Sequence, residues 1–72
     1  MATIKAYKVI ADEASATITY IGYAAPNALT SSPVWKILRI TISGTTVYTV
    51  ESADGDHEFN NIWDNRASLS YS

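Results

Sequence analysis

Apolar and polar residues alternate along much of this chain with a period of two, which is typical of β-strands. Four runs combine this alternation with many β-branched and aromatic residues, and each predicts a strand: residues 3–11, 16–24, 34–42 and 45–52. Polar residues 12–15 separate the first two runs and Ser43-Gly44 separates the last two, so we expect two antiparallel hairpins. Gly44 suits a turn position with positive φ. Residues 25–33 contain two prolines and are expected to form the loop between the hairpins.

The period changes in the last twenty residues. Four side chains there recur at i, i+3, i+4 and i+7, which is one face of a helix: Phe59, Ile62, Trp63 and Arg66. They predict a short helix near residues 57–65, with Asp56 as its N-cap. Residues 67–72 alternate Leu69 and Tyr71 with serines, which favours a returning edge strand. One set of side chains is expected to lock this closing segment onto the sheet: Phe59, Ile62, Trp63, Arg66 and Leu69.

The length of 72 residues limits the chain to a single domain, residues 1–72, that buries only roughly 60% of its unfolded surface. The pattern predicts a mainly β protein, a small antiparallel sheet or barrel of four to five strands with one short helix. Alternation alone does not distinguish an open sheet from a closed barrel, because both present one face of each strand to a core.

Both faces of the predicted strands are apolar. In residues 34–42, Trp35 and Ile37 point to one side, and the opposite side carries a longer apolar row: Val34, Leu38, Ile40 and Ile42. A small sheet has a core for one face only. Burying one exposed Trp or Ile side chain contributes roughly 1.5–3 kcal/mol to the free energy of folding or association. We therefore expect self-assembly or docking on a partner protein. The expected contact residues are Tyr20, Tyr23, Trp35 and Tyr48, although Trp35, like Trp63, also suits the core.

Charge and composition exclude several classes of function. The net charge is −2, with four cationic and two acidic side chains in residues 1–50 against one and five in residues 51–72. This asymmetry favours packing of the closing segment against the basic strands, and it argues against nucleic-acid binding, which needs a concentrated basic patch. No apolar run approaches the roughly 18 residues of a membrane span. The first residues lack the features of a signal peptide, so we expect synthesis in a cytoplasm.

Candidate chemistry gathers in the acidic stretch after the fourth predicted strand. Asp54, Asp56 and Glu58 are candidate calcium ligands, but they do not follow the EF-hand spacing, so a solvated turn is the preferred interpretation. His57 stands without a second histidine, a cysteine or a G-x-S-x-G motif, which favours a surface histidine. We expect neither enzymatic activity nor a cofactor. Arg66 is expected to pair with an acidic side chain or to stack on an aromatic ring.

Two stretches, residues 18–40 and 53–72, make up 43 of the 72 residues and carry a recognisable set of residues: Tyr20-Ile21-Gly22, Trp35 with Ile37, Arg39 and Ile40, Ala53-Asp54-Gly55-Asp56, Phe59, Trp63-Asp64-Asn65-Arg66-Ala67-Ser68-Leu69 and Tyr71-Ser72. In these residues the chain resembles a group of short, mostly uncharacterised proteins of tailed bacteriophages. Members of the group often have W-x-I-K-R-I where this chain has Leu38 in place of the first basic residue. Leu38 makes that strand more apolar and puts any shared charged contact at this position in doubt.

The resemblance implies a minor structural component of the phage particle. The genes of such proteins resemble genes that lie next to virion genes in phage genomes. Our first hypothesis is therefore a small virion protein, made in the cytoplasm of the host bacterium, that assembles with copies of itself or docks on a capsid, neck, tail or fibre protein. The alternative is a host-directed phage protein whose acidic end binds and inhibits a bacterial protein.

Overall fold

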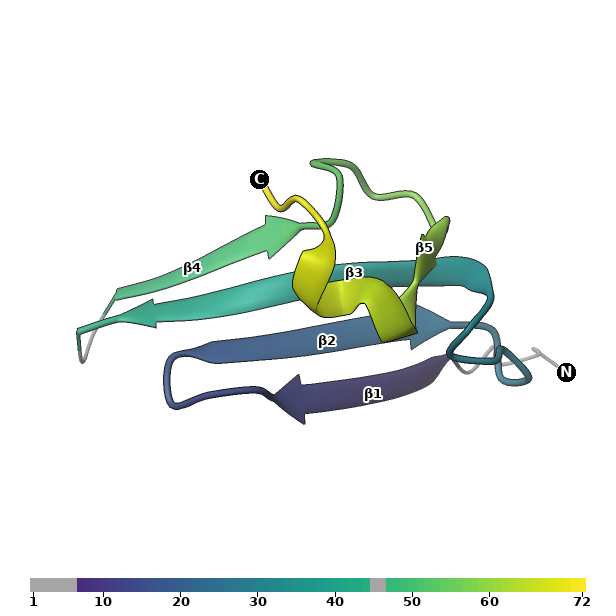
Figure 1. The fold of residues 1–72 in the computed structure, drawn as a ribbon, viewed down its shortest axis with the longest axis horizontal. Helices are drawn as coiled ribbons and strands as arrows, with labels where there is room; N and C mark the ends of the chain where they lie inside the picture. Colours follow the sequence, from purple (N-terminus) through teal and green to yellow (C-terminus); the bar gives the residue numbers. More distant parts are fainter. Residues whose placement is uncertain (1–6, 45–46) are drawn as a thin grey trace, which may run out of the picture.

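The computed structural model describes residues 7–44 and 47–72, which form an open, five-stranded antiparallel sheet with one short 3-10 helix (Figure 1). The prediction of a mainly β fold is confirmed, and the sheet does not close into a barrel. The strand order is β1-β2-β3-β4, and β5 pairs with the free end of β3. The elements are β1 (Lys8–Glu13), β2 (Ile18–Ala24), β3 (Pro33–Ser43), β4 (Val47–Ser52), β5 (Asn61–Ile62) and the helix η1 (Trp63–Ser68).

The two expected hairpins are present. β1 pairs with β2 and β3 pairs with β4, both antiparallel, and β2 pairs with β3 to join the hairpins into one layer. Gly44 has a φ of 71°, as its turn position requires. β1 continues through Glu13, two residues into the stretch expected to form the turn. Residues 3–6 of the first predicted strand and residues 45–46 of the fourth lie outside the described part of the chain.

The closing segment differs from its prediction in place and in type. The short helix begins at Trp63 instead of near His57, and it is a 3-10 helix of six residues. Asn61-Ile62 pairs with β3 beyond the point where β4 ends, so the chain is extended where a helix was expected. Asp56 does not cap the helix, because its Oδ1 accepts a hydrogen bond from the backbone N–H of Glu58 at 3.0 Å.

The returning strand predicted for residues 67–72 is reduced to one bridge. Tyr71 pairs with Ala53, and Ser72 exchanges two backbone hydrogen bonds of 3.1 Å with Ser52. The helix η1 itself is far shorter than a bilayer crossing requires, and it is the only helix in residues 7–44 and 47–72.

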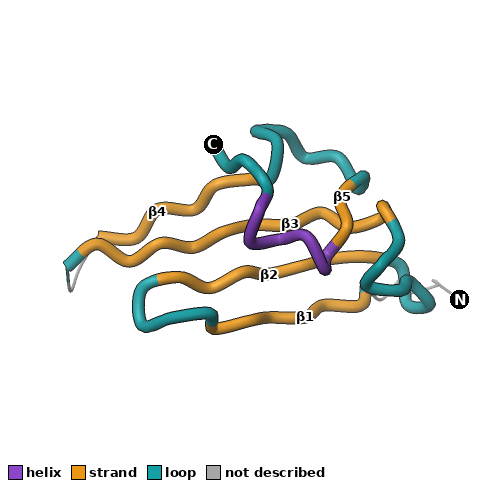
Figure 2. The backbone as a smooth tube through the Cα atoms, viewed as in Figure 1, coloured by secondary structure: helices purple, strands orange, loops and turns teal. Residues whose placement is uncertain are grey.

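The core lies between η1 and one face of the sheet, which we call the covered face (Figures 1 and 2). Trp63 packs there on Gly22 and Trp35, and the two indole rings lie 5.9 Å apart. The core cluster consists of Tyr20, Ala24, Ala28, Trp35, Ile37, Ala53 and Trp63. A hydrogen bond of 2.9 Å from Trp35 Nε1 to the carbonyl of Leu29 holds the loop between the hairpins against this core.

The opposite face of the sheet, which we call the open face, carries no second layer among the described residues (Figure 2). In Figure 1 the helix covers the middle of β2 and β3, and β3 and β4 extend beyond it. The radius of gyration is 13.1 Å, against about 11 Å for a compact domain of this length. The protein is therefore a flat, elongated sheet that is covered on one side.

Candidate functional site

The open face is a continuous apolar surface made of alternate residues of four strands. Because successive side chains of a strand point to opposite faces, the neighbours of the buried Trp35 and Ile37 point away from the core. The apolar residues of the open face are Val9, Ala11, Ile21, Tyr23, Val34, Leu38, Ile40, Ile42, Tyr48 and Val50. None of them belongs to the buried core cluster.

The edges of this face are its most exposed part. The exposed fractions are 54% for Val9, 62% for Tyr48 and 59% for Val50. In the central strands Leu38 and Ile40 are half-buried by their neighbours. Burying an apolar side chain fully contributes roughly 1.5–3 kcal/mol, so half-exposed residues leave a substantial part of that free energy unused. A contiguous apolar patch of this kind is typical of surfaces that bind another molecule.

An aromatic hollow lies at one end of the open face. It has a volume of about 380 Å³ and is lined by Tyr7, Tyr23, Lys36, Leu38 and Phe59. The rings of Tyr7 and Phe59 stack, with centroids 6.0 Å apart and planes 13° apart. Tyr7, which precedes β1, thus contacts Phe59, which lies in the loop before β5. Both residues are more than two-fifths exposed. The hollow is a shallow apolar site with one cation at its wall.

Two charged side chains sit in the open face, at different levels along the strands. Lys36 lies beside Tyr23 and Val9 in the register, at the hollow. Glu13 lies in the row that crosses Thr19 and Ile40. Neither forms an ion pair within residues 7–44 and 47–72. The face is therefore apolar along its middle and charged with opposite sign toward its two ends.

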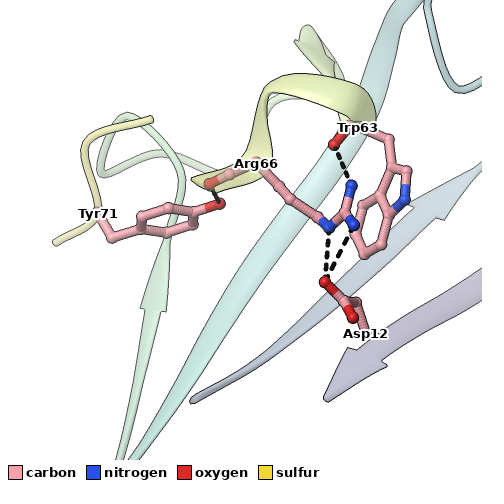
Figure 3. Close-up of polar contacts among 4 residues, drawn as sticks. All are labelled: Asp12, Trp63, Arg66 and Tyr71. Atoms are coloured by element: carbon pink, nitrogen blue, oxygen red, sulfur yellow. Dashed lines mark hydrogen bonds and ion pairs between the residues drawn. The ribbon is translucent and has the colours of Figure 1, made fainter. Parts of the chain in front are cut away.

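Arg66 fastens the closing segment to the first strand (Figure 3). Its Nε and Nη2 both lie 3.0 Å from Oδ2 of Asp12, and its Nη1 donates to the carbonyl of Trp63 at 3.2 Å. The guanidinium carbon lies 4.6 Å from the centroid of the Trp63 ring. The expected role of Arg66 is confirmed in both of its forms, because it pairs with a carboxylate and stacks on an aromatic ring.

Tyr71 completes this lock at the end of the chain. Its hydroxyl donates a hydrogen bond of 2.8 Å to the carbonyl of Arg66 (Figure 3), and its ring lies 5.8 Å from that of Tyr20. The guanidinium of Arg39 sits 4.7 Å above the Tyr71 ring and also pairs with Glu51 at 2.8 Å. Burial, followed by the nearby Tyr20, raises the pKa of the Tyr71 hydroxyl to about 12.

The structure divides the four expected contact residues into two pairs. Tyr48 is exposed and Tyr23 is half-buried, and both lie in the open face. Tyr20 and Trp35 point the other way and are only 7% and 0% exposed. Their assignment as surface contact residues is wrong, because a side chain enclosed in the core of its own subunit has no surface left for a partner. The alternative placement of Trp35 in the core is confirmed.

The five residues expected to lock the closing segment are also divided. Trp63 is buried, and Leu69 packs against the core cluster. Ile62 is half-buried in β5, in register with Pro33. Phe59 does not join them, because it precedes β5 and lies 45% exposed against Tyr7. Its assignment to the lock is therefore wrong, and its ring belongs to the hollow of the open face.

The acidic stretch forms an exposed turn. Asp54 has a φ of 60° and Gly55 a φ of 70°, which are left-handed conformations typical of tight turns. Asp54, His57 and Glu58 are exposed. Within the described residues, no three Asp, Glu, His or Cys side chains lie close enough together to hold a metal ion. The weak calcium candidate of the sequence therefore has no preformed site in this part of the chain.

Several residues of the site escaped the sequence analysis. Asp12 is distant in sequence from Arg66, and no spacing rule links them. Gly22 offered a signal, because an isolated glycine inside a strand often marks a close approach of another group. A Cβ at Gly22 would lie 2.6 Å from the ring of Trp63. Tyr7 and Lys36 line the hollow together with Phe59, which is distant from both in the sequence. The sequence pattern therefore gave no sign of this grouping.

Comparison with known proteins adds no relative: no protein family, curated protein or solved structure matches this chain.

Proposed function

We propose that this chain is a small structural or interaction protein, a minor component of a tailed-phage particle, that associates with other proteins through the open face of its sheet. The observation that supports this proposal is the apolar open face, whose outer residues Val9, Tyr48 and Val50 are each more than half exposed.

The energetic argument rests on the small size of the domain. At about 0.05–0.15 kcal/mol per residue, a chain of 72 residues has roughly 4–11 kcal/mol of total stability. Covering the exposed halves of several apolar side chains on the open face contributes an amount of the same order. Association through this face would therefore stabilise the fold as well as fix the protein in an assembly.

The assignment to a phage particle depends on the resemblance described above. The closing motif shared with the phage proteins includes Trp63, Arg66 and Tyr71, which fasten η1 to the sheet. The motif thus accounts for how the fold is closed and leaves the open face to specify the partner. Leu38, where the group often has a basic residue, lies in that face and lines the hollow. The departure makes the face more apolar, which suits association better than catalysis.

Mass spectrometry of purified phage particles tests this function. We expect the chain to be present in particles purified through a density gradient, at a ratio to the major capsid protein that stays constant between preparations. A matched pair of variants in the phage genome sharpens the test. Val50→Lys places a charge on the open face and should remove the protein from particles, whereas Thr49→Lys, on the adjacent residue and the opposite face, should not. Abundant protein in the lysate with none in the particles would contradict the proposal.

The exposed acidic turn favours a second candidate function, a host-directed protein that binds a basic site on a bacterial protein. This function predicts that one host protein is captured from lysate by the wild-type chain. The charge-neutral variant carrying Asp54→Asn and Glu58→Gln should lose that capture while it keeps the fold, because Asn tolerates the left-handed conformation of residue 54. Capture that persists in this variant would exclude the acidic turn as the binding site.

A further inference from the structure

We infer that the partner on the open face is a second copy of this chain, packed face to face as a two-layer sandwich in which the strands of the two sheets run in opposite directions. This inference rests on the proposed role of the open face as an association surface, and it names the partner. Three properties of that face support it: its area, the placement of its charges and the difference in shape between its two ends.

The area is sufficient for a specific dimer. Strands lie about 4.8 Å apart and rise about 3.3 Å per residue. The strands β1, β2, β3 and β4 hold 6, 7, 11 and 6 residues and therefore offer a footprint of about 480 Å² per copy. Two copies together bury about 1,000 Å², which reaches the lower limit of specific interfaces. Two sheets packed in this way lie about 10 Å apart and bury both apolar faces at once.

The two ends of the face are complementary in shape. At one end is the hollow between Tyr23 and the Tyr7–Phe59 pair. At the other end is Tyr48, paired with Ile42 and 62% exposed. A two-fold axis that runs across the strands near Leu38 reverses the strand direction of the second copy, so the level of the hollow lies opposite the level of Tyr48. Two-fold symmetry repeats this alignment of levels at both ends of the sandwich.

The charges favour the same orientation. Lys36 lies one level before the row of Leu38, where it pairs with Tyr23, and Glu13 lies one level after that row, at the level of Ile40. The reversed orientation therefore places Lys36 of one copy at the level of Glu13 of the other, about 10 Å to the side because β3 and β1 are two strand spacings apart. It also separates the two Lys36 side chains by about 13 Å along the strands. The orientation with parallel strands would instead place the two Lys36 side chains at the same level, where like charges repel.

Sedimentation velocity of the purified full-length chain over a range of concentrations tests the dimer. We expect a species of twice the 7.8 kDa subunit mass. Val50→Lys should weaken self-association by about tenfold or more, because it places a charge in the apolar interface. Thr49→Lys is the matched control on the opposite face and should leave the dimer intact. Both residues are exposed in the subunit, and circular dichroism of each variant checks that the sheet is formed.

A charge exchange tests the orientation. Lys36→Glu and Glu13→Lys should each weaken the dimer by about threefold to tenfold, and the variant that carries both substitutions should recover self-association to within about twofold of wild type. The inference is overturned if the wild-type chain stays monomeric at several hundred micromolar, or if its oligomer is indifferent to Val50→Lys. Failure of the double variant to recover would overturn the reversed orientation.

These outcomes are separable from those of the proposed function. A monomeric chain that enters phage particles through a Val50-dependent contact would refute the second copy as partner and leave the particle role intact. A dimer that dissociates with Val50→Lys but never appears in particles would support the sandwich and refute the particle role.

Discussion

Gly22 is the position at which a single methyl group should do most damage to this fold. The six-membered ring of Trp63 lies over it, and a Cβ built at residue 22 would sit 2.6 Å from Cε3 and 2.8 Å from Cζ3 of that ring. Carbon atoms in contact are normally about 3.5–4.0 Å apart, so the indole would have to move by about 1 Å. Trp63 has little room to do so, because Trp35 packs against it and the Arg66 guanidinium stacks on its ring.

The expected cost follows from two opposing effects. Overpacking of a core costs about 1–3 kcal/mol. Gly22 does not occupy the left-handed region, so alanine at this position would by itself stabilise the protein by about 0.4–1 kcal/mol through a less flexible unfolded chain. We expect a net loss of about 1.5 kcal/mol for Gly22→Ala, which corresponds to a fall in Tm of about 6–12 °C for a domain of this size.

A double-mutant cycle identifies the cause of that loss. Trp63→Ala alone should cost about 3–5 kcal/mol, and in that background the added methyl group of Gly22→Ala has room and should cost nothing. The assay is urea unfolding followed by far-ultraviolet circular dichroism, at one protein concentration because the proposed self-association would stabilise the folded state. Gly22→Ala that leaves the free energy of unfolding unchanged or raises it would refute the reasoning. Equal costs of Gly22→Ala in both backgrounds would show that Trp63 is not the group it meets.

Three further predictions concern the lock and the second turn. Asp12→Asn should lower the free energy of unfolding in urea by only about 0.5–1 kcal/mol, because the ion pair with Arg66 is partly exposed, whereas Arg66→Met should cost about 1–2 kcal/mol since it also removes the stack on Trp63. The hydroxyl of Tyr71 has a pKa of about 12 in the folded protein and 10.0 as its ordinary value, so the folded state holds this proton more tightly. Its contribution to stability is present below pH 10 and is lost as the pH rises from about 10 to about 12. The fall in Tm over this pH range should therefore be smaller in Tyr71→Phe than in the wild type. Equal curves of Tm against pH would contradict the raised pKa of Tyr71. Gly44→Ala should cost about 1–2 kcal/mol in urea unfolding through its positive φ alone, since a Cβ there meets nothing within 4 Å, and an unchanged midpoint would contradict that conformation.

The strands and the first hairpin turns could be predicted from the sequence because they depend on local features. A period of two with β-branched residues specifies an extended chain, and the polar break and Gly44 specify where it reverses. The structure moves the ends of these strands by only a few residues. The role of Arg66 was predictable in kind, since a guanidinium among aromatic and acidic residues finds such partners.

The closing segment was harder to predict because its spacing suits more than one structure. Phe59, Ile62 and Trp63 have the periodicity of one helical face, yet Phe59 and Trp63 lie on opposite faces of the sheet. The difference arises because Asn61-Ile62 pairs with the end of β3 that β4 leaves free. That pairing satisfies backbone hydrogen bonds between residues far apart in the chain, and a local pattern carries no information about it.

Sequence alone determined that this protein is a small antiparallel sheet with more apolar strand surface than one core can bury. It did not determine which face is the core, because an alternating strand with large apolar residues at both parities looks the same from either side. The tertiary structure decided the matter through the closing segment: the indole of Trp63 lies in the gap left by the missing side chain of Gly22 and packs on Trp35, and the ring of Tyr71 packs on Tyr20. With that face occupied, Tyr48 and Val50 are left to water or to a partner.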